Sequence, residues 1–207
     1  NYSISSVYNN LEDIKQLSPS VDLLVIASPT KLHLHSIETL LQIVTPKIIL
    51  CEKPLAENLD ECEKIIRLCN KKKIKVITNF MRRSLPVIKD LRRKICSSFP
   101  CKYDVIVKYS GCFQNNGSHF VDLMAYLYGS PEKIVQCVYD VNSVAHLKVR
   151  ATVRYKHAIC TYVPLASNSV VDHSVEIMSD KIKISIGRAG REVEMRKASP
   201  DLDFLNT

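Results

Sequence analysis

Glu52, Lys53 and Pro54 stand out chemically because they follow directly on an apolar run, residues 47–51. Such a run is typical of a short strand that is covered on both faces, as in a parallel sheet. Proline has no N–H and ends the hydrogen-bonded ladder, which places Glu52 and Lys53 at the carboxyl end of the strand. Open α/β sheets bind their ligands at that edge. The alternative is that both are solvated loop charges, as most charged side chains are.

His119 is a second candidate for chemistry, because residues 118–128 read as a helix with Ser118 as its N-cap. The positive end of a helix disfavours an imidazolium, so a histidine in the first turn stays neutral and can accept a proton near neutral pH. Asp122 lies one turn further on, where it either orients His119 or caps local donors. The alternative for His119 is a histidine that only satisfies a nearby backbone group.

Strands and helices alternate in the first half of the chain. Three apolar runs predict strands, at residues 21–27, 47–51 and 75–80. Helices are expected at residues 9–17, after Pro29, from residue 58 and from Pro86. This alternation implies a parallel sheet with right-handed crossovers. The sequence contains no Gly-x-Gly-x-x-Gly, so we expect the phosphate-binding βαβ unit of such a fold to precede Asn1.

The pattern changes after residue 97. Strands are predicted at residues 103–109, 133–141, 145–154, 158–164, 173–178 and 181–186. No crossover helix separates the later strands, which favours an open, mainly antiparallel sheet. The predicted fold class is therefore α/β. A partial, Rossmann-like nucleotide-binding domain at residues 1–97 precedes an α+β domain for substrate binding and oligomerisation at residues 98–207.

Composition excludes several classes of protein. The net charge is +8, but the basic clusters carry no interleaved aromatic residues, so we expect no nucleic-acid partner. No apolar run is long enough to cross a bilayer, so no membrane partner is expected. The eight cysteines include no CxxC pair, and we expect no metal. They are predicted to be reduced core thiols of a cytoplasmic protein.

Four stretches in register resemble the Gfo/Idh/MocA family, the group of glucose–fructose oxidoreductase and inositol dehydrogenase. They are Val-Ile-Ala-Ser-Pro-Thr-Lys-Leu-His at 25–33, Leu-Cys-Glu-Lys-Pro-Leu-Ala at 50–56, Arg82-Arg83 followed by Pro86, and Gly-Ser-His-Phe-Val-Asp-Leu at 117–123. Their order and spacing match the family from the middle of its nucleotide domain well into its second domain.

The resemblance implies an NAD(P)-dependent oxidoreductase that acts on a sugar, polyol or nucleotide sugar by hydride transfer, with NAD or NADP as cofactor. It implies cofactor-binding roles for seven residues, Ser28, Pro29, His33, Glu52, Lys53, Pro54 and Arg82, and substrate-binding roles for Asn115 and Asp122. It also implies a cis Lys53–Pro54 bond and a homo-oligomer formed through the open sheet.

Alcohol oxidation needs a base for the hydroxyl proton and a group that holds the oxygen. We expect Lys53 and His119 to be the catalytic residues and to point into a common cleft. Partial desolvation beside a cationic nicotinamide would lower the pKa of Lys53. The family commonly has an aspartate four residues before this histidine, where this chain has Asn115. Asparagine cannot accept a proton, so the alternative function is a non-catalytic sensor or scaffold that retains the oxidoreductase fold.

Overall fold

The computed structural model describes residues 7–9, 13–14, 20–98, 101–140, 147–166 and 171–197. The chain divides into two compact units, unit 1 at residues 1–79 and unit 2 at residues 80–207. Most of the helix expected at residues 9–17 lies outside the described residues.

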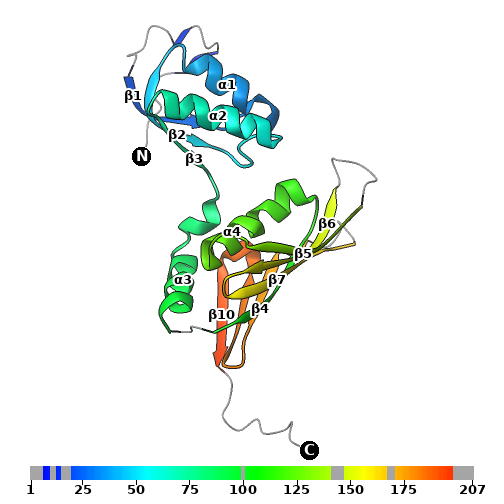
Figure 1. Ribbon diagram of the computed structural model, residues 1–207. Helices are drawn as coiled ribbons and strands as arrows, with labels where there is room; N and C mark the ends of the chain where they lie inside the picture. The colour runs from blue at the N-terminus through cyan, green and yellow to red at the C-terminus, as the bar shows by residue number, and fades with distance from the viewer. Residues whose placement is uncertain are drawn as a thin grey trace, which may run out of the picture. The chain divides into compact units, whose positions relative to one another are not determined.

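Unit 1 is built on a three-stranded parallel sheet in the order β1-β2-β3 (Figure 1). Its strands are β1 (Ser20–Ile26), β2 (Thr45–Cys51) and β3 (Lys75–Thr78). Helix α1 (His33–Leu40) follows β1 and α2 (Leu59–Lys71) follows β2, as the alternation predicted. Asn58 caps α2, because its side chain accepts a hydrogen bond from the Glu61 N–H. The predicted β-α-β order is thus confirmed.

Both helices of unit 1 pack against the same face of the sheet. Ile26, Ile49 and Cys51 are buried in one core with side chains from α1 and α2. On the other face of β1, Leu23 and Val25 are 52% and 54% exposed. The two crossover helices lie side by side on one side of the sheet (Figure 1). On β2, which was expected to be covered on both faces, Ile49 and Cys51 are buried and Ile48 and Leu50 are half-buried, so its second face is only partly covered.

Unit 2 contains a seven-stranded mixed sheet in the order β10-β9-β8-β4-β7-β6-β5. Its strands are β4 (Tyr103–Tyr109), β5 (Lys133–Asp140), β6 (Lys148–Tyr155), β7 (Ala158–Pro164), β8 (Ser174–Met178), β9 (Ile182–Gly187) and β10 (Glu192–Lys197). Strands β4 and β7 pair in parallel, and every other neighbouring pair is antiparallel. The predicted mainly antiparallel sheet is confirmed.

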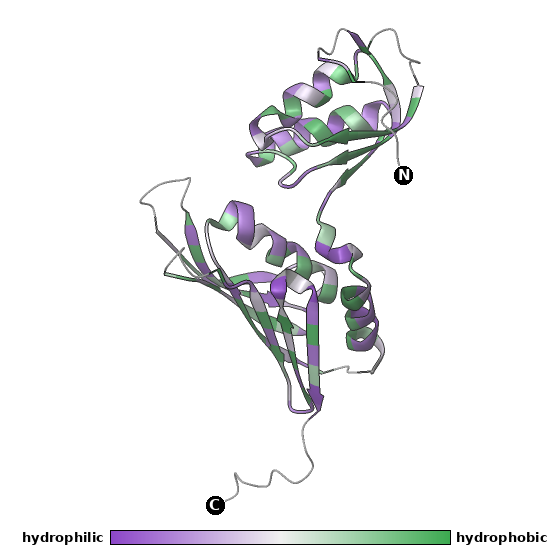
Figure 2. Ribbon diagram, turned by 180° about the vertical axis from the view of Figure 1, so that it is seen from behind, coloured by the Kyte–Doolittle hydropathy of each residue, from purple (hydrophilic) through white to green (hydrophobic). Residues whose placement is uncertain are grey.

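Helices α3 (Pro86–Ser98) and α4 (Ser118–Tyr128) cover one face of this sheet and leave the other face open (Figure 2). The strands alternate accordingly: Val105, Val107 and Tyr109 of β4 are buried, whereas Ile106 between them is 37% exposed. The α4 helix ends where predicted, because Gly129 adopts a φ of 88° that favours glycine.

Packing sets the boundary between the units earlier than residue 97. Ile88, Leu91 and Ile95 of α3 are buried in the same core as the strands of unit 2. The helix therefore belongs to the second compact unit, which begins at Phe80. Sequence periodicity identified the helix correctly, but it cannot tell which sheet a helix face covers.

The thiols only partly follow the prediction. All eight cysteines are free, and Cys51, Cys69 and Cys160 are buried as expected. Cys96 and Cys137 are exposed, so the prediction of core thiols is wrong for them. Cys137 is exposed because β5 is an edge strand whose described side chains all face solvent.

Candidate active site

The carboxyl edge of the sheet in unit 1 carries the Glu-Lys-Pro segment. Strand β2 ends at Cys51, and the Glu52 N–H still donates to the Ile26 carbonyl oxygen at 2.9 Å. The Glu52 side chain is not a solvated loop charge, because it accepts a 2.6 Å hydrogen bond from Nδ2 of Asn79, just after β3. The Lys53–Pro54 bond is cis, as the resemblance implied.

The side chain of His33 holds the Glu52-Lys53-Pro54 segment in place through hydrogen-bond contacts. It is fully buried, and its Nε2 lies 2.8 Å from the carbonyl oxygen of Ser28. Its Nδ1 lies 3.1 Å from the Pro54 oxygen and 3.4 Å from Sγ of Cys51. Burial raises the pKa of the Cys51 thiol to about 12, so at neutral pH it remains an S–H donor.

These contacts define the role of His33. Each ring nitrogen lies within hydrogen-bond distance of a carbonyl oxygen, Nε2 of that of Ser28 and Nδ1 of that of Pro54, and the tautomer decides which nitrogen donates. His33 thereby ties the loop after β1 to the turn that carries Lys53. Both ring nitrogens contact protein atoms, so His33 positions the segment. Direct cofactor contact by His33 stays a prediction.

The hydroxyl group of Ser28 is the feature of this edge that fits a bound ligand. Its hydroxyl oxygen is buried and has no hydrogen-bond partner among the described residues. Buried polar groups are normally satisfied, so an orphan hydroxyl at the carboxyl edge of a parallel sheet fits a polar ligand there. Pro29, the next residue, is exposed. The Ser28 hydroxyl is therefore placed to bind a polar ligand, whereas cofactor binding by Pro29, Glu52 and Lys53 stays a prediction.

In unit 2, a π-helical turn at Phe113–Gly117 precedes α4 and changes the setting of His119. The chain is already helical at Ser118, whose N–H donates to the Phe113 carbonyl oxygen and whose hydroxyl donates to Asn115. Ser118 is thus not the N-cap, and the argument from a free positive helix end does not apply to His119. A side chain at Gly117 would collide with Phe113, since its Cβ would lie 2.4 Å from the ring.

His119 is half-buried, and its ring meets that of Phe80 edge-on, with the centroids 6.0 Å apart. Asn115 is exposed in the π-helical turn, one helical turn before His119. The sequence pointed to both residues through the family motif. Phe80, the aromatic ring that fixes the imidazole, was not predicted, because nothing in its neighbourhood distinguishes it from a core residue.

Asp122 forms an ion pair with Arg83. Nε of Arg83 donates to Oδ2 of Asp122 at 2.6 Å, and an Nη nitrogen of the same guanidinium donates to Oδ1. The Asp122 side chain is 6% exposed and that of Arg83 45%. Burial raises the pKa of Asp122, although Arg83 opposes the shift. Arg82, the adjacent arginine, is buried against Phe120.

Arg83→Gln is expected to destabilise the protein by about 1–2 kcal/mol, because it leaves the buried carboxylate of Asp122 without its cation. Loss of Arg83 raises the pKa of Asp122 further, and a raised folded-state pKa costs stability at high pH. The defect should therefore shrink as the pH falls and Asp122 becomes protonated. Urea unfolding at neutral and acidic pH measures both effects.

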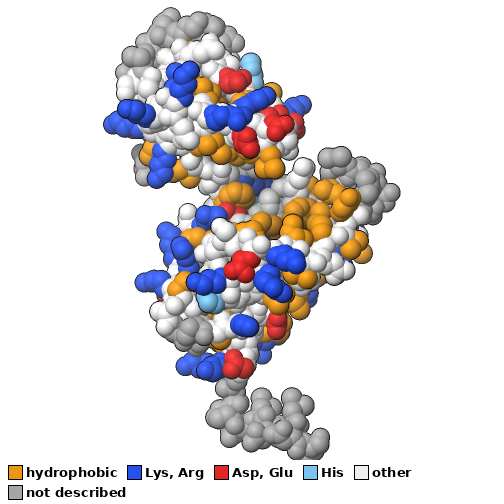
Figure 3. Space-filling model, in the orientation of Figure 1, with side chains coloured by type: hydrophobic (Ala, Val, Ile, Leu, Met, Phe, Trp, Pro, Cys, Tyr) orange, Lys and Arg blue, Asp and Glu red, His pale blue; other side chains and the backbone are white. Residues whose placement is uncertain are grey.

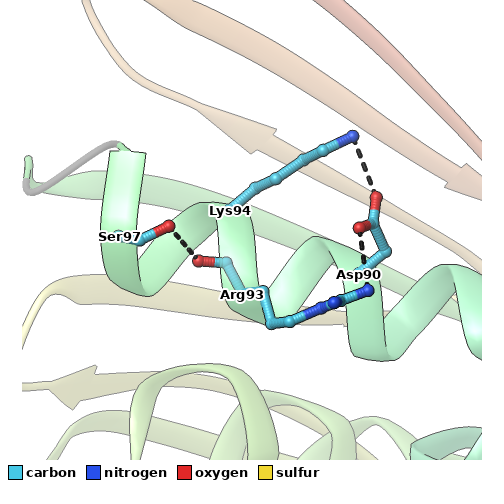
Figure 4. A network of polar contacts seen from close by, with 4 residues as sticks. All are labelled: Asp90, Arg93, Lys94 and Ser97. Carbon is cyan, nitrogen blue, oxygen red and sulfur yellow. Dashed lines mark hydrogen bonds and ion pairs between the residues drawn. The ribbon is translucent and has the colours of Figure 1, made fainter.

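The matched control is Arg93→Gln. Arg93 pairs with Asp90 at 3.2 Å on the exposed face of α3, where Asp90 also contacts Lys94 at 2.9 Å (Figure 4). Exposed ion pairs contribute little, so this variant should unfold almost like the wild type at either pH. Equal effects of the two substitutions would contradict the importance of the Arg83–Asp122 pair.

The predicted residues fall into two groups, one in each unit. Ser28, His33, Glu52, Lys53 and Pro54 lie at the carboxyl edge of the sheet in unit 1. A second group lies on η3 (Met81–Ser84), the π-helical turn and α4 of unit 2, and consists of Arg82, Asn115, His119 and Asp122. That Lys53 and His119 face one cleft stays a prediction.

Three other features of the described ranges concern membrane helices, metal ligands and cavities. No helix in them is long and apolar enough to pass through a membrane. Nor do these ranges group three His, Cys, Asp or Glu side chains as a metal ion would require. A cavity of about 310 Å³ in unit 2 lies beside the C-terminal end of α4, between Tyr126, Tyr103 and His157, and contains none of the predicted site residues.

Comparison with known proteins supports unit 1 most directly. Residues 1–80 match the family model GFO_IDH_MocA, described as an oxidoreductase family with an NAD-binding Rossmann fold. The chain is also 27% identical over 94 residues to the Salmonella typhimurium protein YceM, which is named as an oxidoreductase. That match covers 45% of this chain and 30% of YceM.

Solved structures extend the likeness over both units. The WlbA dehydrogenase of Bordetella pertussis, solved with NADH and UDP-GlcNAcA, has a TM-score of 0.77 at 19% identity over 95% of this chain. The UDP-N-acetylglucosamine 3-dehydrogenase GnnA of Acidithiobacillus ferrooxidans has a TM-score of 0.71 at 16% identity over 95% of this chain. The chain covers 64% of WlbA and 68% of GnnA. The family match over unit 1 and the shared fold together confirm the predicted resemblance to the Gfo/Idh/MocA oxidoreductases.

Proposed function

We propose that this chain is part of an NAD(P)-dependent oxidoreductase that transfers a hydride at a secondary alcohol or ketone of a sugar, polyol or nucleotide sugar. The observation that carries the proposal is the edge of the parallel sheet in unit 1. There an orphan Ser28 hydroxyl and a braced Glu52-Lys53-Pro54 segment lie within residues that match an NAD-binding family. The bound nicotinamide would supply the hydride chemistry.

The residues of the chain divide the remaining tasks. Ser28 and Glu52 would hold the cofactor, and Lys53 would steady the reacting oxygen. His119 would take the hydroxyl proton or return it, its ring held by Phe80. Nucleotide sugars are favoured within the substrate class, because WlbA and GnnA, which share the fold, bind or act on UDP-sugars.

A homo-oligomer formed through the sheet of unit 2 belongs to the same proposal. The open face exposes Ile106 and Ile159, and the edge strand β5 exposes Ile134, Val138 and Tyr139 by 56–64%. Figure 3 shows hydrophobic side chains gathered over this side of unit 2. Apolar patches of this kind are typical of interaction surfaces. A full-length protein that sediments as a monomer at micromolar concentration would contradict this.

A non-catalytic sensor is the second candidate, and Asn115 is the residue that favours it, because it replaces a carboxylate of the family motif. A turnover assay separates the two. The full-length protein is incubated with NAD⁺ or NADP⁺ and one member of each class, UDP-GlcNAcA, myo-inositol or glucose, and reduced cofactor is followed by its absorbance. We expect turnover with the UDP-sugar. Cofactor binding without turnover on any class would overturn the enzyme in favour of the sensor.

A further inference from the structure

Arg82 is a buried cation with no counter-ion among the described residues. The residue is only 8% exposed, and its Nη1 is buried with no hydrogen-bond acceptor among the described residues. Burial lowers the pKa of the guanidinium to about 10, so it still carries its charge at neutral pH. One neighbour of the guanidinium is an aromatic ring: Cζ of Arg82 lies 4.2 Å from the centroid of Phe120. A cation–π contact offsets only part of the cost of burying a charge.

Arg83, the next residue, is an arginine of the same unit whose charge is paired with a carboxylate. Arg83 reaches the carboxylate of Asp122 through two hydrogen bonds, although its side chain is far more exposed. Within the described ranges, no Asp or Glu forms an ion pair with Arg82. Among the described residues, an anion thus pairs with the exposed Arg83 and none pairs with the buried Arg82.

His173, which packs near the same Phe120 ring, is a second residue with a buried nitrogen that has no hydrogen-bond partner among the described residues. Its ring centroid lies 6.1 Å from that of Phe120, and its Nδ1 is buried without a partner among the described residues. Burial, and then the charge of Arg82, lower the pKa of His173, which keeps the imidazole neutral. A neutral imidazole can still place its one N–H on either nitrogen, so Nδ1 can donate to an acceptor.

The segment that carries His173 is fixed to the loop that follows β4. The Ser110 hydroxyl accepts from the Asp172 N–H at 2.9 Å and donates to the Asp172 carbonyl oxygen at 3.2 Å. Ser110 is itself buried. The histidine is therefore held in place before any ligand arrives, and this preorganisation reduces the entropic cost of binding.

We propose that Arg82, for which the resemblance implied a cofactor-binding role, instead forms with His173 a binding site for an oxyanion, a carboxylate or phosphate group, carried by the substrate. This inference rests on the proposed function, because the anionic group belongs to the nucleotide sugar: either the diphosphate or a sugar carboxylate. The guanidinium fork suits either oxyanion, and the imidazole N–H adds a neutral donor.

Binding rather than turnover tests the site. The full-length protein and its Arg82→Gln variant are titrated calorimetrically with UDP, glucuronate and inorganic phosphate in chloride-poor buffer. Loss of a charge-assisted hydrogen bond should weaken binding of the recognised anion about 10- to 100-fold. Preferential binding of UDP or phosphate assigns the site to the diphosphate, and preferential binding of glucuronate assigns it to the sugar carboxylate. Arg93→Gln, which removes an exposed arginine of the same unit, should leave affinity unchanged.

Thermal unfolding without added anion separates this role from a structural one. Since Arg82 is uncompensated, its neutral substitution should leave the melting temperature equal or higher. Equal anion affinity of wild type and Arg82→Gln would overturn the proposal, and so would an absence of binding together with a lower melting temperature of the variant. Arg82-dependent anion binding by a protein without turnover would refute the enzyme while the anion site stands.

Discussion

His119→Ala is expected to lower kcat of the full-length enzyme by ~10²- to 10⁴-fold, the usual effect of losing a positioned general base. The imidazole is half-buried and meets the ring of Phe80 edge-on, a contact that restricts its rotation. Cofactor affinity should change little, because His119 lies in unit 2 and the family's NAD-binding match ends at residue 80. Steady-state kinetics with NAD(P)⁺ and the sugar, together with fluorescence titration of NAD(P)H, measure both quantities.

His157→Ala is the matched control, because His157 is an exposed histidine of the same unit in the turn between β6 and β7. Its side chain should be dispensable, and kcat should stay at the wild-type value. If His119→Ala turned over as fast as His157→Ala, His119 would not be the base. A fall in kcat with an equal fall in thermal stability would instead indicate that the ring only packs against Phe80.

Asn115→Asp then distinguishes a weakened enzyme from an adapted one. Asn115 is exposed in the turn before α4, so an aspartate fits there without burying a charge. In a weakened enzyme the new carboxylate restores a proton acceptor near His119 and raises kcat. In an enzyme adapted to asparagine, kcat stays the same or falls. The His119→Ala background provides the control, because the benefit of the carboxylate should vanish there.

Local patterns in the sequence predicted the elements well, and tertiary relations poorly. The α4 helix and the strands β4 and β7 begin and end at the predicted residues, because alternation, Gly129 and the apolar runs all agree. Strand β10 was not predicted. Its only apolar residues, the half-buried Val193 and Met195, alternate with the charged Glu192, Glu194 and Arg196, so the sequence has no apolar run there. A strand at the edge of a sheet needs only one apolar face, and that face was too short to recognise.

In the candidate site, too, the local motifs could be predicted and the tertiary contacts could not. Motif register identified Lys53 and His119, but the contacts that define their surroundings connect residues distant in sequence. The Asn79–Glu52 and Arg83–Asp122 hydrogen bonds span 27 and 39 residues, and the Tyr109 hydroxyl bonds to Val149 over 40. No local sequence pattern predicts hydrogen bonds between residues so far apart in the chain. The π-helical turn was also missed, because Asn-Asn-Gly reads as a simple loop before a capped helix.

Lys53→Met is the second substitution with a large expected effect. Methionine keeps the length and apolar stem of lysine and removes the ammonium group, so the fold of the turn should persist. If Lys53 steadies the oxygen as its charge changes, kcat should fall ~10²- to 10³-fold, as it does when one oxyanion donor is removed. Cofactor affinity should also fall, because the turn belongs to the unit that matches the NAD-binding family.

Hydrogen-bond contacts hold the turn on both sides of Lys53, so the effect of Lys53→Met can be assigned to the lost ammonium group. Asn79 holds Glu52, and His33 contacts the Pro54 carbonyl oxygen, so neither brace depends on the ammonium group. Lys75→Met is the control, since Lys75 is an exposed lysine of the same unit at the start of β3. That variant should match the wild type in kcat and in cofactor affinity.

Combining Lys53→Met with His119→Ala tests the predicted common cleft. Residues that act on one substrate oxygen as a unit have strongly non-additive effects on kcat. We therefore expect the double variant to be scarcely slower than the more damaged single variant. Residues of two separate sites would instead multiply their effects on kcat, because distant substitutions add in free energy. Multiplied effects, or full activity in Lys53→Met, would remove Lys53 from the mechanism and leave His119 without its predicted partner across the units.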